Sequence, residues 1–66
     1  MQIIVNGKPR EAREGATVLT LLEEMKLNPQ TIVVELNKTI LNREAFGEKR
    51  LGDGDRLELV RLVGGG

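Results

Sequence analysis

The side chains that carry out most acid–base and nucleophilic chemistry are missing from this chain. It has no Ser, His, Cys, Tyr or Trp, so it lacks the usual general base near neutral pH and the serine and cysteine nucleophiles. Carboxylates remain, but no pair of them lies in an apolar segment that would shift a pKa. Asp53 and Asp55 lie in the sequence GDGD (52–55), which indicates a surface turn, with an oxygen-ligand metal site as the alternative. We therefore expect a protein that is not an enzyme and that binds no metal.

A run of three glycines, Gly64, Gly65 and Gly66, is the feature that most needs a reason. Glycine has no side chain to pack, and ordering it costs more backbone entropy than ordering any other residue. The run follows a strand-like segment, RLELVRLV (56–63). Two interpretations stay open from the residues alone: an inert trailing end, or an active part of the molecule. We accordingly divide the chain into a folded domain, 1–63, and a flexible C-terminal glycine tail, 64–66.

The composition indicates one small soluble domain. A chain of 66 residues buries only about 60% of the surface that its unfolded form exposes. Ten basic residues balance ten acidic ones and no block of one sign occurs, so we expect neither nucleic acid nor a membrane as a partner. The lack of cysteine agrees with a reducing compartment, and no signal peptide or spanning segment is apparent. We expect a cytoplasmic protein.

Hydrophobic periodicity predicts a hairpin and then a helix in the first half of the chain. Strands are expected at 2–6 and at about 8–13, joined at Asn6-Gly7, which tolerates positive φ. Pro9 places the second strand at a sheet edge. Thr17 is a suitable N-cap, and Asn28-Pro29 should end the helix. The apolar stripe of this helix is expected to face the core and comprises Val18, Leu21, Leu22 and Met25.

The second half predicts three further strands. We expect strands at 31–37, at a short segment with Ile40 and Leu41 after an Asn37-Lys38 turn, and at 56–63, with one helical turn at 43–46. A single helix must then cover one face of a mixed five-stranded sheet. With a right-handed crossover, the last strand lies parallel to the first in the middle of that sheet. The predicted class is α+β with the β-grasp, or ubiquitin-like, fold.

The last strand predicts a surface for partners. Leu57 and Leu59 share one side and should meet the helix, which leaves Val60 and Leu62 on the opposite side of the strand. Ile4 belongs to the same outer face if the first and last strands are neighbours. These residues are either ordinary, partly exposed apolar side chains or a docking patch beside the tail. We favour the docking patch.

The order of several segments resembles the ThiS family of sulfur carriers over essentially the whole chain. These segments are IIVNGK, VLTLLEEMKL, LNKTILNRE, LGDGDRLELV and the terminal GGG. Each segment alone is weak evidence for the family, but the order and spacing of all of them together are specific to it. Two departures, Asn42 where the family often has proline and Phe46 where it often has tryptophan, leave the fold and tail expectations unchanged. Phe46 is the only aromatic residue, and we expect it to cap the core.

The resemblance implies a chemistry in which the chain is a cosubstrate. The carboxylate of Gly66 would be adenylated by an E1-like (ThiF-like) enzyme that uses ATP, so the chain itself would bind no cofactor. A sulfur donor such as a cysteine desulfurase system would then convert it to a thiocarboxylate. That group would deliver sulfur to thiazole synthase (ThiG) in thiamine biosynthesis. Gly64 and Gly65 would let the tail enter a narrow channel, while Ile4, Val60 and Leu62 would supply binding affinity.

Other functions of the same fold stay open. Within carriers, a MoaD-like molybdopterin subunit or another sulfur-transfer pathway uses a similar end. A ubiquitin-like protein modifier would pass the adenylated glycine to a lysine. In a different class, a β-grasp interaction module with an inert tail would show no ATP-dependent change at Gly66.

Overall fold

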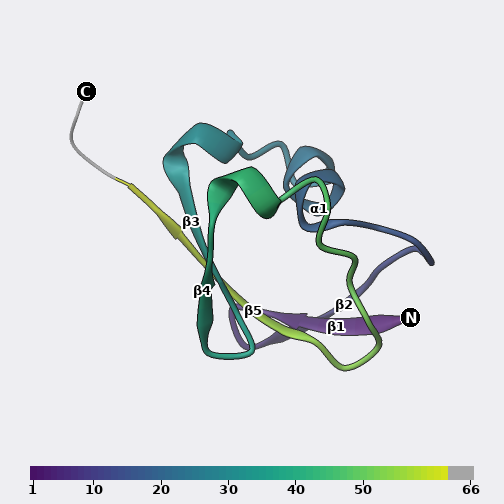
Figure 1. The fold of residues 1–66 in the computed structure, drawn as a ribbon. Coiled ribbons are helices and arrows are strands. Elements are labelled where there is room, and N and C mark those ends of the chain that lie inside the picture. Colours follow the sequence, from purple (N-terminus) through teal and green to yellow (C-terminus); the bar gives the residue numbers. More distant parts are fainter. Residues whose placement is uncertain (63–66) are drawn as a thin grey trace.

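The sheet is mixed and has its last strand in the middle (Figure 1). The computed structural model describes residues 1–62, and the strands are ordered β2-β1-β5-β3-β4. β5 pairs in parallel with β1 and antiparallel with β3. This topology confirms the predicted β-grasp fold. The strands are β1 (Gln2–Val5), β2 (Lys8–Glu11), β3 (Ile32–Leu36), β4 (Thr39–Leu41) and β5 (Arg56–Arg61).

Two tight turns set the register of the outer hairpins. Asn6 and Gly7 have φ values of 51° and 82°, and Asn37 and Lys38 have 51° and 72°, the left-handed conformation that such two-residue turns require. The predicted turns are therefore confirmed. β2 ends at Glu11 rather than near residue 13. Backbone bonding to the first strand continues only to Ala12, whose N–H donates to the Met1 carbonyl at 2.7 Å.

Helix α1 (Val18–Glu24) begins where predicted and ends earlier than predicted. The Thr17 side chain accepts a hydrogen bond from the Thr20 N–H at 3.2 Å, which satisfies one unpaired donor of the first turn. At the other end, Lys26 adopts a φ of 60°. The Leu27 N–H donates to the Leu22 carbonyl at 2.9 Å, a closure that usually uses glycine. Because lysine rather than glycine occupies that position, the sequence does not indicate that the helix ends there.

The segments 29–31 and 43–45 form short 3-10 helices rather than parts of longer ones. Asn28 caps the first, η1 (Pro29–Thr31), by accepting a bond from the Gln30 N–H. The second, η2 (Arg43–Ala45), is the single helical turn that we predicted. The Arg43 guanidinium donates to the carbonyls of Pro29 (2.8 Å) and Ile32 (3.3 Å), so it joins the two 3-10 helices at the start of β3.

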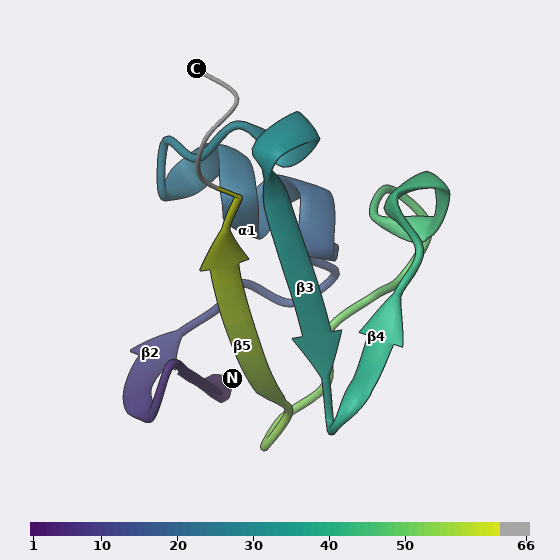
Figure 2. The same cartoon turned by 90° about the vertical axis from the view of Figure 1, so that its left-hand side faces the viewer.

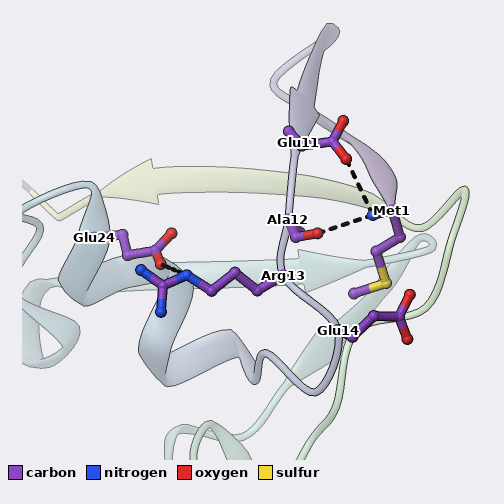
Figure 3. A pocket seen from close by; sticks show the side chains of 6 residues that line it. All are labelled: Met1, Glu11, Ala12, Arg13, Glu14 and Glu24. Atoms are coloured by element: carbon purple, nitrogen blue, oxygen red, sulfur yellow. Dashed lines mark hydrogen bonds and ion pairs between the residues drawn. The ribbon is translucent and has the colours of Figure 1, made fainter.

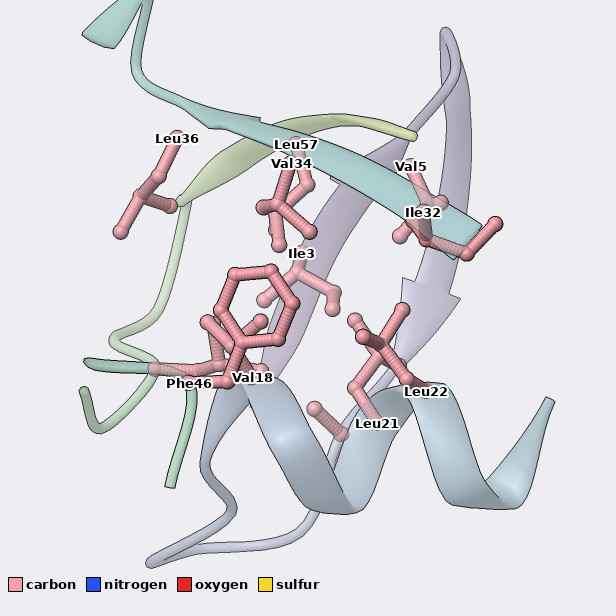
Figure 4. Close-up of a cluster of buried hydrophobic side chains, with 12 residues drawn as sticks. Ile3, Val5, Val18, Leu21, Leu22, Ile32, Val34, Leu36, Phe46 and Leu57 are labelled. Atoms are coloured by element: carbon pink, nitrogen blue, oxygen red, sulfur yellow. The ribbon is translucent and has the colours of Figure 1, made fainter. Parts of the chain in front are cut away.

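The core lies between the inner face of the sheet and α1 (Figure 4). Phe46 is buried and closes the core beside Val18, which confirms its predicted role as a cap. Met25 and Leu59 are only partly buried, so these two predicted core residues lie at the margin. The buried apolar residues are Ile3, Val5, Ala12, Val18, Leu21, Leu22, Ile32, Val34, Leu36, Phe46, Leu51 and Leu57.

Candidate functional site

The glycine tail lies outside the described residues, together with Val63. The roles predicted for Gly64, Gly65 and Gly66 therefore stay predictions. The structure does define the point from which the tail departs. The Leu62 N–H donates to the Thr31 carbonyl at 2.7 Å, so pairing with the β3 side continues one residue beyond β5. The position of Leu62 is thus set by the sheet.

The outer face of the sheet, away from α1, exposes apolar side chains beside this departure point. Val60 is 56% exposed and Leu62 is 52% exposed, as predicted from the strand alternation. Val60 pairs with Val33 of β3, and side chains directly opposite in a sheet share one face. The two strands therefore place Val33, Val60 and Leu62 together.

Ile40 extends this apolar surface, and the sequence analysis did not assign it a role. It is 67% exposed and pairs with Glu35 of β3, which puts it diagonal to Val33 on the outer face. The exposure of Ile40 could have been predicted from the turn at Asn37-Lys38. A two-residue connection makes Leu36 pair with Thr39, and Ile40 then points to the outer face. We call Val33, Ile40, Val60 and Leu62 the outer patch.

Ile4 lies on the same face but apart from the outer patch. Its partner in β5 is Arg56, and it is half-buried. Glu58 lies between Arg56 and Val60 on that side of β5. The structure therefore brings Val60 and Leu62 together but does not bring Ile4 to them.

A charged strip separates Ile4 from the outer patch. Glu58 and Glu35 are direct cross-strand partners, an arrangement that is unfavourable for like charges. With Lys38 and Arg56 they border a hollow of about 190 Å³ beside Ile4. None of these four charged groups has an ion-pair partner in the described part of the chain. The outer face therefore offers a partner both apolar contact and unpaired charges of either sign.

Asp53 and Asp55 stabilise a turn, as predicted. Asp53 accepts a hydrogen bond from the Gln2 N–H at 2.8 Å. Asp55 accepts from the Gly52 N–H at 2.7 Å and from the Asn37 amide at 3.0 Å. The turn is thereby tied to β1 and to the β3–β4 hairpin. Within residues 1–62 no three His, Cys, Asp or Glu side chains gather as metal ligands.

A second hollow, of about 670 Å³, lies by the N-terminal end of β1 (Figure 3). The amino group of Met1 donates to Glu11 at 3.1 Å and to the Ala12 carbonyl at 3.0 Å. Arg13 and Glu24 form an ion pair at 3.6 Å. Of the charged groups that line the hollow, only Glu14 has no ion-pair partner within residues 1–62. Most of the charge is therefore used within the fold. None of the helices in the described segment has the length and apolar character to cross a membrane.

Comparison with known proteins identifies the family. The family model described as ThiS family matches residues 3–66, a span that includes the glycine run. The chain belongs to the ThiS family. The fold agrees, because the crystal structure of the thiamine biosynthesis protein (ThiS) from Geobacter metallireducens superposes with a TM-score of 0.85. That protein is 39% identical, and the alignment covers 100% of both chains.

Two kinds of relative bear on function. The sulfur carrier protein ThiS of Bacillus subtilis is 36% identical over 63 residues, covering 94% of this chain and 96% of that protein. A thiazole synthase of Magnetococcus marinus is 36% identical over all 66 residues of this chain. The chain spans only 20% of the length of that thiazole synthase. A segment like this one therefore occurs both as a small protein and within a larger enzyme.

Proposed function

We propose that this chain is a sulfur carrier of thiamine biosynthesis whose reactive group is the carboxylate of Gly66. The observation that carries the proposal is the family match over residues 3–66, with relatives of nearly equal length that are named sulfur carriers. The thiazole synthases that contain a matching segment support thiazole synthase as the acceptor of the sulfur.

The chemistry uses the chain only as a carrier of an acyl group. A carboxylate oxygen of Gly66 attacks the α-phosphorus of ATP on an E1-like adenylating enzyme, and pyrophosphate leaves. The terminal sulfur of a persulfide, supplied by a donor such as a cysteine desulfurase, then attacks the activated carbonyl and AMP leaves. A thiol reduces the resulting acyl disulfide to a thiocarboxylate. ATP is bound by the partner enzyme, and this chain needs no cofactor of its own.

Glycine suits the tail for steric and conformational reasons. A side chain at Gly65 or Gly66 would crowd the carbonyl under attack, and glycine adopts backbone conformations closed to other residues. When extended, the four residues after Leu62 reach at most about 14 Å, which carries the carboxylate away from the sheet. Ordering such a tail costs roughly 1–2 kcal/mol per residue, so the binding affinity has to come from the folded surface.

We expect conversion of the C-terminal peptide when the protein is incubated with ATP, its adenylating enzyme and a sulfur donor. One oxygen of the Gly66 carboxylate should be exchanged for sulfur, and omitting ATP should prevent the exchange. The product has to be mapped to the peptide ending in Gly66, because oxidation of Met1 or Met25 adds nearly the same mass. Alkylation of the new sulfur confirms its position.

Other outcomes of this experiment separate the alternatives. Transfer of the adenylated glycine to a lysine of another protein would favour the ubiquitin-like modifier. Conversion followed by sulfur delivery to a pterin rather than a thiazole precursor would favour a MoaD-like carrier. No change at Gly66 with the cognate enzyme present would contradict the carrier function and favour an interaction module.

The outer patch is the surface that we propose for docking to the adenylating enzyme. Replacing Val60 and Leu62 together by Asp should weaken binding by about tenfold or more, because a charge buried at an interface without a partner is costly. In the free protein both side chains are mostly exposed, so the fold should persist in a thermal melt. Titration of the enzyme by calorimetry measures the change.

The matched control is the double variant Lys49→Gln/Arg50→Gln. It lowers the net charge by the same two units, on an exposed loop that packs against the start of α1. Its affinity should stay within about twofold of wild type if contact at the outer patch, rather than net charge, decides docking. Equal weakening of both variants would remove the patch from the interface.

A further inference from the structure

The side of β5 that faces β1 is paired for only part of its length (Figure 2). The β1 ladder ends at the pair Val5–Leu57, because β1 itself ends there, whereas pairing with β3 continues to Arg61. Figure 2 shows the end of β5 beside β3 on one side, with no strand of the described chain on the other. The second half of this central strand, Leu59–Arg61, is thus a sheet edge on the β1 side.

Hydrogen-bond directions show which backbone groups this edge presents. The Leu62 N–H points to the β3 side, where it bonds to Thr31, and the Leu59 N–H points to the β1 side, where it bonds to the Asn6 side chain at 2.8 Å. Successive residues of a strand alternate in this direction, so the Arg61 N–H also points to the β1 side. No acceptor for it is found there within residues 1–62. The Leu59 carbonyl on the same side has no donor in that part of the chain.

An apolar groove of about 300 Å³ lies along this open edge. Its apolar walls come from the end of α1, the loop after it and the strands, and these side chains are at most half exposed. Arg61 is exposed at the rim, and its guanidinium has no ion-pair partner among the described residues. The lining residues are Asn6, Met25, Leu27, Ile32, Leu59 and Arg61.

We infer that an extended segment of the adenylating enzyme adds as a short strand to β5 at Leu59–Arg61, an inference that rests on the proposed function. One residue of a parallel strand would donate its N–H to the Leu59 carbonyl and accept from the Arg61 N–H. An apolar side chain of that segment fills the groove, and an acidic one meets Arg61. Because β5 leads directly into the tail, strand addition fixes the direction in which the Gly66 carboxylate is presented.

Amide hydrogen exchange of the ¹⁵N-labelled protein tests the open edge directly. In the free protein the Arg61 amide should exchange rapidly, while the neighbouring Val60 amide, which points to β3, should be protected. In a saturated complex with the adenylating enzyme, exchange at Arg61 should slow by about tenfold or more. Protection of Arg61 in the dilute free protein, or rapid exchange in the complex, overturns the inference.

Proline substitution supplies a second test, because proline removes a single N–H. Arg61→Pro should leave the melt nearly unchanged, since that N–H has no partner in the fold, whereas Val60→Pro should destabilise the sheet by removing a bond to β3. Arg61→Pro should also raise the Kd for the enzyme about fivefold more than Arg61→Ala, which removes the charge and keeps the N–H. Equal effects of the two Arg61 variants on binding overturn strand addition.

The remaining outcomes are distinct. Protection of Arg61 that appears in the protein alone as its concentration rises assigns the edge to a second copy of the chain, and overturns the enzyme as occupant. Sulfur transfer to Gly66 without protection of Arg61 overturns only the strand addition. Absence of sulfur transfer together with protection of Arg61 overturns the proposed function and leaves strand addition in place.

Discussion

A chain that lacks Gly65 and Gly66 should accept no sulfur under conditions that convert the full chain. Each extended residue spans about 3.3–3.6 Å, so the deletion withdraws the carboxylate by about 7 Å. Reacting atoms need to approach to about 3–3.5 Å, and a carboxylate held back by twice that distance cannot reach the α-phosphorus of ATP. The measurement is the mass of the alkylated C-terminal peptide after incubation with ATP, enzyme and donor.

Adding one alanine after Gly66 should abolish the reaction as well. The carbonyl of Gly66 then belongs to an amide, and the new carboxylate is displaced by about one residue length. Gly66→Ala is the matched control, because it keeps the length and the terminal carboxylate while adding one methyl group; it should slow conversion without eliminating it. None of these changes should move the melt, since the glycines follow the last residue of the sheet ladder. Sulfur on the chain extended by alanine would contradict the carrier mechanism.

Leu57→Ala should lower the free energy of unfolding by roughly 2–5 kcal/mol. Leu57 is 1% exposed and lies on the central strand, where it pairs with Val5 on one side and Leu36 on the other. Truncation removes buried apolar contacts and leaves a cavity that the two neighbouring strands hold open. A domain of this length has only a few kcal/mol to lose, so the thermal midpoint should fall by at least about 8 °C.

Val60→Ala is the control for the position of the side chain on β5. Val60 lies on the same strand but 56% of it is exposed, so its truncation should cost about 1 kcal/mol or less. Urea unfolding gives the free energy of unfolding of each variant. The two values are compared with the same slope of free energy against urea concentration. A Leu57→Ala variant as stable as Val60→Ala would show that the inner face of β5 contributes little to the core.

The elements governed by local chemistry were predictable from the residues that form them. Asn6-Gly7 and Asn37-Lys38 favour positive φ wherever they occur, and Thr17 offers a capping oxygen to any helix that follows. The alternation in IVVEL (32–36) specifies which side chains can share a face. These local signals, with one helix to cover one sheet, sufficed for the β-grasp topology and for the exposure of Val60 and Leu62.

The end of α1 shows where such local prediction fails. Asn28-Pro29, which we predicted would end the helix, instead begins η1. The helix ends earlier because Lys26 adopts a left-handed conformation. Lysine has no intrinsic preference for that conformation. The bond from Leu27 to Leu22 and the partial burial of Leu27 against the core hold it there.

The sequence by itself determined the strands, the turns, the inner and outer faces and, through its order of segments, the family. Only the tertiary structure decided which outer residues are neighbours, because that depends on the register between strands far apart in the chain. It paired Val60 with Val33 across β5 and β3, and set Ile4 apart behind Glu58. It also left the end of β5 open, since β1 stops at Val5 while β3 runs on to pair with Arg61. Strand length and register are settled by packing around the common core, which no single segment encodes.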